Sequence, residues 1–259
     1  MFLLLRGMPR VAILLLMVVM CGCAHRSQPT RMWNASMIAD HGQDVAVIKL
    51  FGDSRHTKGK KKRENVVVAT VNTADVRNLI RIKEQVESAV GELRAELLIA
   101  EGNEPNGFSF SRTTEQYIAI NIGMINLLRQ DEDALAALIG HELAHLYLAH
   151  SKQRQDREYS RGITTTVIAF ALGVVGVPYG VVDYATGTIA KSYSREEERD
   201  ADRLAVTFIS HAGFDPWGAV RLNEKLATVP GTSKMSFLST HPATVERIEN
   251  MKRQVQELQ

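Results

Sequence analysis

The segment IGHELAHLYLAH, residues 139–150, contains the residue types that could hold a metal ion. Three histidines, His141, His145 and His150, and one glutamate, Glu142, interrupt an otherwise apolar stretch. Positions four apart on a helix differ by only about 40°, so His141 and His145 project side by side. This is the H-E-x-x-H pattern, in which two imidazoles bind Zn²⁺ and the glutamate acts as general base on the metal-bound water. The competing interpretation is a pair of ordinary helix histidines, which would need buried polar partners.

His150 does not fit the same set. A longer three-histidine motif exists, but it needs a glycine turn and places its third histidine ten residues after the first. Here no glycine intervenes, and His150 follows His141 by nine residues, about 180° round the same helix. We therefore predict that His150 is structural or partly exposed and lies outside the site unless the helix breaks.

A third ligand is offered by three consecutive glutamates in SREEERDAD, residues 194–202. On a helix, Glu198 lies on a largely apolar stripe, whereas Glu196 lies on a charged face. A carboxylate on an apolar stripe needs a compensating charge, which a zinc ion on the facing helix would supply. We therefore predict Glu198 as the third ligand, and Asp202, one turn on, as the hydrogen-bond acceptor that fixes a ligand histidine.

Hydrophobic periodicity predicts the elements that position these residues. Residues 103–112 are rich in turn formers, and Asp131 has the features of a helix N-cap. The predicted fold is α+β and predominantly helical, with a small sheet and a central H-E-x-x-H helix that faces a second ligand helix. The predicted elements are strands 45–51, 65–71, 95–102 and 117–128, and helices 73–93, 131–150, 194–214 and 241–259.

The N-terminus has the features of an export signal. Arg6 and Arg10 precede the apolar run 11–20, which is shorter than the roughly 20 residues of a membrane span. The sequence MCGC that follows resembles the lipobox of bacterial lipoproteins, which implies cleavage before Cys23 and acylation of that cysteine. Ala24 in place of an aspartate favours the outer membrane. Since the other cysteine leaves with the signal, any metal in the mature protein must be held by His, Asp or Glu.

These features predict a signal peptide at 1–22, a lipid-anchored tether at 23–44 and one domain at 45–259. Lys and Arg number 31 against 29 Asp and Glu, so the net charge of +2 gives no electrostatic reason to expect nucleic acid. The basic run 58–63 is typical of a solvated loop. The apolar segment 163–182 is interrupted by glycines and a proline, and we expect it to be buried, to cover the cleft or to touch the membrane rather than to span it.

HELAH, followed some fifty residues later by SREEERDADRLA, resembles the HtpX and CAAX-prenyl-protease family of zinc endopeptidases. The signature of that family is H-E-x-x-H followed by E-x-x-x-D, here Glu198 to Asp202. EPNGFSF and STHPATVERI are similar to two further family segments, so the resemblance covers roughly 65–250, and with the lipobox it is to the periplasmic lipoprotein branch. It implies a gluzincin-type metallopeptidase domain with one Zn²⁺ and Glu142 as the catalytic base.

The resemblance also implies a role for His241, which can approach the zinc as a fourth ligand or switch, although a turn or cap residue explains its position equally well. The implied function is a zinc endopeptidase, lipid-anchored at the periplasmic face of the outer membrane. Its partners would be misfolded or incompletely assembled envelope polypeptides, the membrane through Cys23, and the outer-membrane assembly machinery. The alternative is a non-catalytic zinc lipoprotein that binds outer-membrane proteins. Tyr193 and Arg247, together with His241, are unranked candidates for stabilising the oxyanion.

Overall fold

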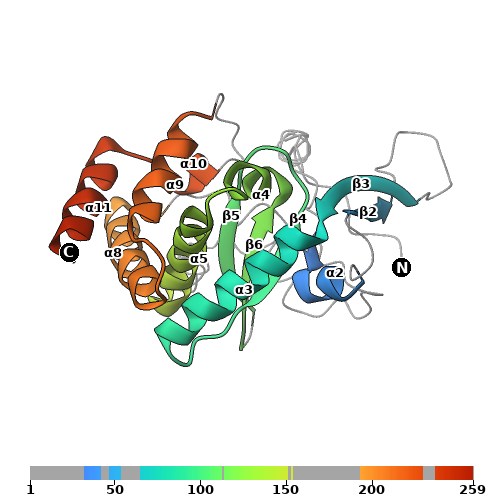
Figure 1. Cartoon of the computed structure of the whole chain (residues 1–259), viewed down its shortest axis with the longest axis horizontal. Helices are drawn as coiled ribbons and strands as arrows, with labels where there is room; N and C mark the ends of the chain where they lie inside the picture. The colour runs from blue at the N-terminus through green and yellow to red at the C-terminus, as the bar shows by residue number, and fades with distance from the viewer. Residues whose placement is uncertain are drawn as a thin grey trace, which may run out of the picture.

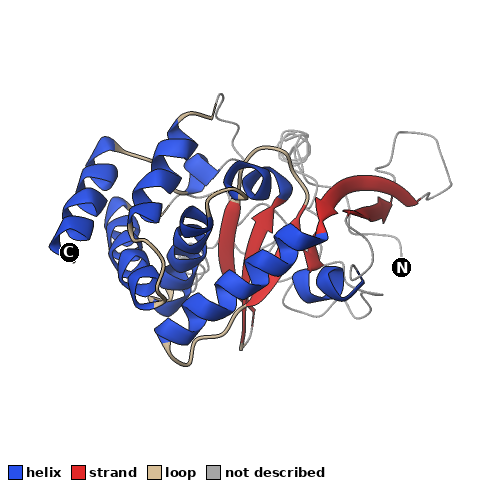
Figure 2. Ribbon diagram, viewed as in Figure 1, coloured by secondary structure: helices blue, strands red, loops and turns tan. Residues whose placement is uncertain are grey.

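The chain is described by a computed structural model in which helices stack on one side of a small sheet (Figures 1 and 2). The predicted signal peptide, Cys23, the basic run 58–63 and the apolar segment 163–182 lie outside the described residues. Within the described residues, no helix combines the length and apolar character that crossing a bilayer requires. The structure describes residues 32–41, 47–53, 65–112, 114–150, 153, 193–229 and 237–258.

The main sheet has four strands in the order β1-β4-β6-β5. β4 and β6 run parallel, while the two outer strands run antiparallel to their neighbours. Successive side chains of a strand point to opposite faces, so Ile99 and Ile120 join the main core. Leu98 and Ala119 instead join a smaller cluster with Phe108 on the other face. The strands are β1 (Met32–Asn34), β4 (Glu96–Ala100), β5 (Gly107–Arg112) and β6 (Glu115–Asn121).

The two strands predicted at 45–51 and 65–71 form a separate hairpin of β2 (Val47–Asp53) and β3 (Asn65–Asn72). β3 leads directly into α3 (Thr73–Val90), because the Asn72 side chain caps the helix by accepting from the Ala74 N–H. The long helix α3 crosses in front of the sheet in Figure 1.

The central helix is α5 (Glu132–Tyr147), the predicted H-E-x-x-H helix. Asp131 caps it as expected, with its side chain accepting from the Ala134 N–H. Every residue from Ala134 to Leu146 is buried, so this helix is surrounded by protein rather than amphipathic. The histidines and the glutamate of the H-E-x-x-H motif are therefore held in a tightly packed, buried setting.

The second predicted helix, α8 (Arg195–His211), packs directly against α5. Gly140 permits the close approach, since a Cβ added there would lie 3.1 Å from Ile209 Cγ2 and 3.4 Å from the Ala205 carbonyl oxygen. α8 begins with a capping box between Ser194 and Glu197. The remaining helices are α2 (Ala35–His41), α4 (Ile122–Leu128), α9 (Trp217–Ala227), α10 (Phe237–Thr240) and α11 (Val245–Glu257).

Two element predictions need correction. The strand predicted at 117–128 ends at Asn121, whose side chain caps α4 by accepting from the Met124 N–H. A side-chain cap thus converts one apolar run from strand to helix midway. The turn-rich stretch 103–112 is only partly a turn, because β5 starts at Gly107 and pairs with β6.

The tether predicted at 23–44 is also too long. Met32 is fully buried in β1, where it pairs with Ala100 of β4. Ala35 and Ile38, on one face of α2, belong to the main core. Apolar side chains at these few positions are enough to draw a largely polar segment onto the domain.

Candidate metal centre

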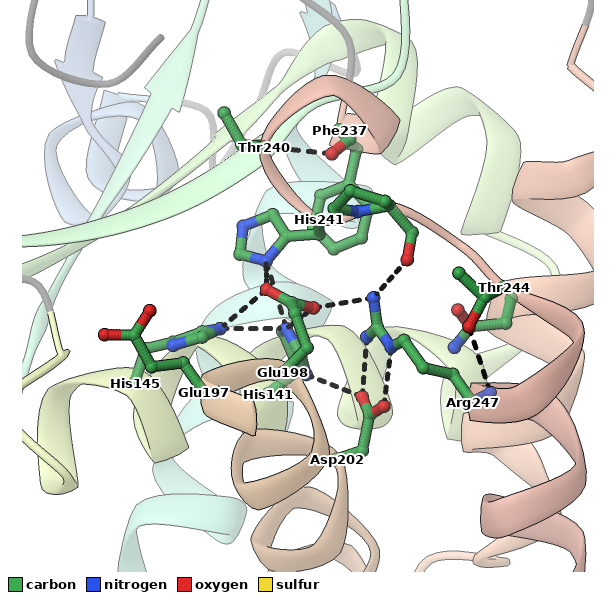
Figure 3. Close-up of polar contacts among 12 residues, drawn as sticks. His141, His145, Glu197, Glu198, Asp202, Phe237, Thr240, His241, Thr244 and Arg247 are labelled. Carbon is green, nitrogen blue, oxygen red and sulfur yellow. Dashed lines mark hydrogen bonds and ion pairs between the residues drawn. The ribbon is translucent and has the colours of Figure 1, made fainter. Parts of the chain in front are cut away.

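Three segments that are distant in the sequence bring nitrogen and oxygen atoms together in the protein interior (Figure 3). From α5, Nε2 of His141 and Nε2 of His145 lie 3.1 Å apart. From α8, the Glu198 carboxylate lies 3.6 Å from the His141 Nε2 and 3.5 Å from the His145 Nε2. His241, which follows α10, places Nδ1 3.2 Å from the His141 Nε2 and 2.8 Å from Glu198 Oε1.

This donor set fits a zinc ion. Zinc sites in proteins are usually tetrahedral, with bonds to nitrogen and oxygen of about 2.0–2.2 Å, which places neighbouring ligand atoms roughly 3.3 Å apart. The four donors lie within 4.8 Å of one another, and their closest pairs are close to that separation. Two imidazoles and a carboxylate are also the ligand types that zinc accepts in hydrolases.

The electrostatics favour a neutral imidazole and an ionised carboxylate at the centre. Burial lowers the pKa of the His145 imidazole well below its usual value, so the ring has a nitrogen lone pair available. Burial alone would raise the pKa of Glu198, but the His241 and His145 rings outweigh it and hold the pKa far below its usual range. His145 would therefore offer a neutral nitrogen, and Glu198 a negatively charged oxygen, to a metal cation.

Glu142 is the fully buried neighbour of this cluster. Within the described part of the chain, neither carboxylate oxygen of Glu142 has a hydrogen-bond partner, and Oε1 lies 3.5 Å from the Nε2 of His241. A buried carboxylate without partners is costly, and such groups in native proteins usually have a catalytic role or face an ion or water. The site therefore has a carboxylate that could act as a base beside its cation-binding atoms.

Asp202 lies behind His141, where the sequence placed an acceptor. Its Oδ1 is 3.1 Å from the His141 Nδ1, opposite the nitrogen that faces the cluster. Burial alone would lower the pKa of His141, but the Asp202 hydrogen bond and the charge of Glu198 outweigh it and raise the pKa. Asp202 therefore fixes how the His141 ring is oriented.

Arg247 of α11 braces the carboxylates. Its guanidinium donates two hydrogen bonds of 2.7 Å to Asp202, approaches Glu198 Oε2 at 2.6 Å and donates to the Pro242 carbonyl at 2.9 Å (Figure 3). These donors face carboxylates and backbone, which argues against Arg247 as the oxyanion stabiliser. The sequence singled out Arg247 only as a candidate for stabilising the oxyanion, and nothing in it indicated the partners of this side chain.

Backbone hydrogen bonds hold the segment that carries His241. The Phe237 N–H donates to the Pro105 carbonyl ahead of β5, and the Tyr193 N–H donates to the Thr240 carbonyl. The Phe237 ring stacks on His241 with centroids 4.4 Å apart. His241 thus enters the cluster from a segment attached on several sides.

His150 lies outside the cluster of four donors, as predicted, but it is not half a turn away from the ligand face as it would be on an unbroken helix. His150 is buried, and its Nδ1 is 3.0 Å from the Nδ1 of His145. α5 ends at Tyr147, and Ala149 takes a left-handed backbone conformation with φ of 54°, which turns the chain back. His150 contributes no atom to the four-residue cluster, but it contacts one of its members.

Comparison with known proteins agrees with this arrangement. Residues 76–255 match the family model of peptidase family M48. The chain is 28% identical to the mitochondrial metalloendopeptidase OMA1 of Saccharomyces cerevisiae over 47% of the chain and 36% of that protein. It is 25% identical to the metalloprotease LoiP of Escherichia coli, over 52% of the chain and 54% of LoiP.

A third relative is the beta-barrel assembly-enhancing protease of Escherichia coli, 25% identical over 49% of the chain and 28% of that protein. The chain thus spans between about a quarter and a half of the length of these relatives. The family model, in contrast, covers well over half of the chain and includes every residue of the cluster. This chain belongs to peptidase family M48.

Proposed function

We propose that this protein is a zinc-dependent endopeptidase in which His141, His145 and Glu198 hold the metal and Glu142 is the general base. The observation that carries this proposal is the fully buried Glu142 carboxylate, which has no hydrogen bond within the described residues, beside three convergent ligand side chains. Zinc held there would act as a Lewis acid that lowers the pKa of a coordinated water and polarises the scissile carbonyl. Glu142 would take the proton of the attacking water and return it to the leaving amine.

The sheet offers a place for an extended substrate. Among the described strands, β5 is an outer strand of the sheet. It lies close to α5, since a Cβ added to Gly107 would lie 3.3 Å from Leu138 Cδ1. An extended peptide can add to such an edge through main-chain hydrogen bonds that are independent of side-chain identity. This favours unfolded polypeptides as the substrate class.

The proposal is tested by Glu142→Gln in the purified protein. We expect this variant to keep zinc, because Glu142 is not a ligand, and to lose casein hydrolysis by about 10²–10⁴-fold, the usual contribution of a general base. Glu132→Gln makes the same chemical change at an exposed position of α5 and should leave the rate unchanged. Hydrolysis by Glu142→Gln at the wild-type rate would exclude the assigned role.

A second candidate function is supported by the position of His241. Structural zinc sites usually have four protein ligands, and His241 supplies a fourth donor. In that case the protein would be a non-catalytic zinc lipoprotein that binds outer-membrane proteins. Complementation of a deletion strain by Glu142→Gln at the wild-type level would favour binding, whereas loss of complementation would favour cleavage.

The cellular setting is also a proposal. The lipobox resemblance at Cys23 supports acylation and a periplasmic position at the outer membrane. Similarity to LoiP and to the beta-barrel assembly-enhancing protease supports a role in the quality control of envelope proteins, with the outer-membrane assembly machinery as partner. Labelling with radioactive palmitate should mark the wild-type protein and leave Cys23→Ala unlabelled.

A further inference from the structure

The contact between His145 and His150 has no part in the proposed chemistry, yet it is built into the protein interior. His145 is completely buried and His150 is 6% exposed. Their Nδ1 atoms are 3.0 Å apart, and the ring centroids are 5.2 Å apart. Two buried imidazole nitrogens at this distance form a hydrogen bond in which one must carry the proton and the other must accept it.

The direction of this hydrogen bond follows from the other side of the His145 ring. Its Nε2 faces the cluster, 3.1 Å from the His141 Nε2 and 3.5 Å from Glu198. A neutral imidazole has one N–H and one lone pair, so a ring that offers Nε2 to a metal carries its proton on Nδ1. His150 Nδ1 is then the acceptor, and the proton of the His150 ring is on Nε2.

We propose that His150 is a positioning residue that fixes the tautomer and orientation of His145 for zinc binding; this rests on the proposed zinc site. His141 is oriented by the Asp202 carboxylate, whose charge Arg247 balances. His145 is oriented by an imidazole instead of a carboxylate. The two ligand histidines therefore have different acceptors.

Two further observations agree with this role. The Tyr193 ring stacks on His145 with centroids 3.8 Å apart and planes 17° apart, so the plane of the His145 ring is also held. The left-handed conformation of Ala149 is unfavourable for a residue with a Cβ. Strained backbone of this kind persists where the surrounding structure requires it, and here it returns His150 to the ligand helix.

The test compares His150→Phe with His150→Asn in the full-length protein. Phenylalanine keeps an aromatic ring but has no acceptor, whereas the Oδ1 of asparagine can accept near the position of the histidine Nδ1. Zinc affinity is measured by competition with a chromophoric chelator, and circular dichroism checks the fold. Loss of the partner of a metal-binding histidine typically costs 10–100-fold in affinity.

We expect His150→Phe to lose zinc affinity by about 10–100-fold and His150→Asn to remain within about threefold of wild type. The matched control is His211→Phe at the exposed end of α8, which should bind zinc as wild type does. A second measurement is the histidine ¹⁵N NMR spectrum of the zinc-loaded protein, in which Nδ1 of His145 should carry the proton.

Three results would overturn the inference. These are wild-type zinc affinity in His150→Phe, an equal loss of affinity in both His150 variants, and a His145 bound to zinc through Nδ1. Failure of the wild-type protein to bind zinc would instead reject the proposed function, and the inference with it. A folded His150→Phe that binds zinc normally would reject the inference alone.

Discussion

At the scale of single residues, His241 supplies the fourth donor atom of the proposed zinc site. Its Nδ1 lies among the ligand atoms of His141 and Glu198, and its Nε2 faces Glu142. A catalytic zinc site keeps one position open, whereas a fourth protein ligand closes it. We therefore propose that His241 is the fourth ligand at rest and leaves when substrate binds.

The variant His241→Phe tests this role, because it keeps the ring packing on Phe237 and removes both ring nitrogens. We expect zinc to bind more weakly and an unstructured peptide to be cleaved several-fold faster, since no resting ligand has to be displaced. Both are measured on the purified protein, by chelator competition and by initial rates. A slower rate with unchanged zinc affinity would indicate that His241 assists the reaction directly.

The phase of a straight helix was sufficient to pair His141 with His145 and to select Glu198 from three glutamates. It failed at His150, because the angle argument assumes an unbroken helix and Ala149 breaks it. Alanine is a strong helix former, so no propensity rule could have predicted that break. The hydrogen-bond partners of Arg247 could not be predicted from the sequence either, since they depend on how α11 packs against α8.

At the scale of elements, the start of α5 is tied to α9 by charge. Arg221 of α9 contacts Asp131, Asp133 and Asp215 at 2.8–3.1 Å, and Lys225 contacts Asp131 at 2.8 Å. Partial burial alone would raise the pKa of Asp131, but hydrogen bonds from Arg221 and Lys225 outweigh it and lower the pKa to about 2. The ligand helix is thus anchored at its first turn.

Asp131→Asn tests this anchor, because asparagine can still cap the helix but has no charge. We expect the free energy of unfolding at pH 7 to fall on the order of 1 kcal/mol, since Arg221 is partly exposed and its ion pairs are screened. Because folding lowers the pKa of Asp131 from 3.8 to about 2, its ionised carboxylate stabilises the folded state above pH 4. This contribution disappears as the pH falls toward 2 and the carboxylate is protonated. The difference in the free energy of unfolding between wild type and Asp131→Asn should therefore shrink between pH 4 and pH 2, as measured by urea titrations with a chelator present. A constant difference would exclude the charge as its cause.

Helices α3, α5, α8 and α11 and strands β2 and β3 were predictable because their apolar periodicity and flanking turn or capping residues agree, whereas α2, α4, α9 and α10 were not predicted. The structure differed from the prediction where a single polar side chain determines whether a segment is strand or helix. Asn121 ends β6 and caps α4 within a continuous apolar run. β1 and α2 form because Met32, Ala35 and Ile38 find places in a core that is built from distant parts of the chain. Periodicity within a short window contains no information about such partners.

At the scale of the whole molecule, the metal centre joins α5, α8 and the segment between α10 and α11. A ligand that binds only the folded state stabilises it by mass action, about 2.7 kcal/mol at a free concentration one hundred times Kd. A metal ion bound at this site would therefore also link these three segments to one another.

Removing the metal with a chelator should lower the melting temperature by about 5–10 °C, and added zinc should restore it. Scanning calorimetry or circular dichroism measures the change. His145→Ala lacks one ligand and should show no zinc-dependent shift, which separates binding at this site from general effects of the ion. Equal melting temperatures with and without zinc would contradict a link between the three segments.

If Cys23 is acylated as proposed, the early start of the sheet at Met32 would limit how far the domain can move from the membrane. With Cys23 acylated as proposed, roughly nine residues connect the lipid to β1, and even fully extended they reach only about 30 Å. That distance is about the diameter of a small domain. Proteolysis would then be confined to a thin layer next to the bilayer, and proximity to the membrane would select substrates before any sequence preference does.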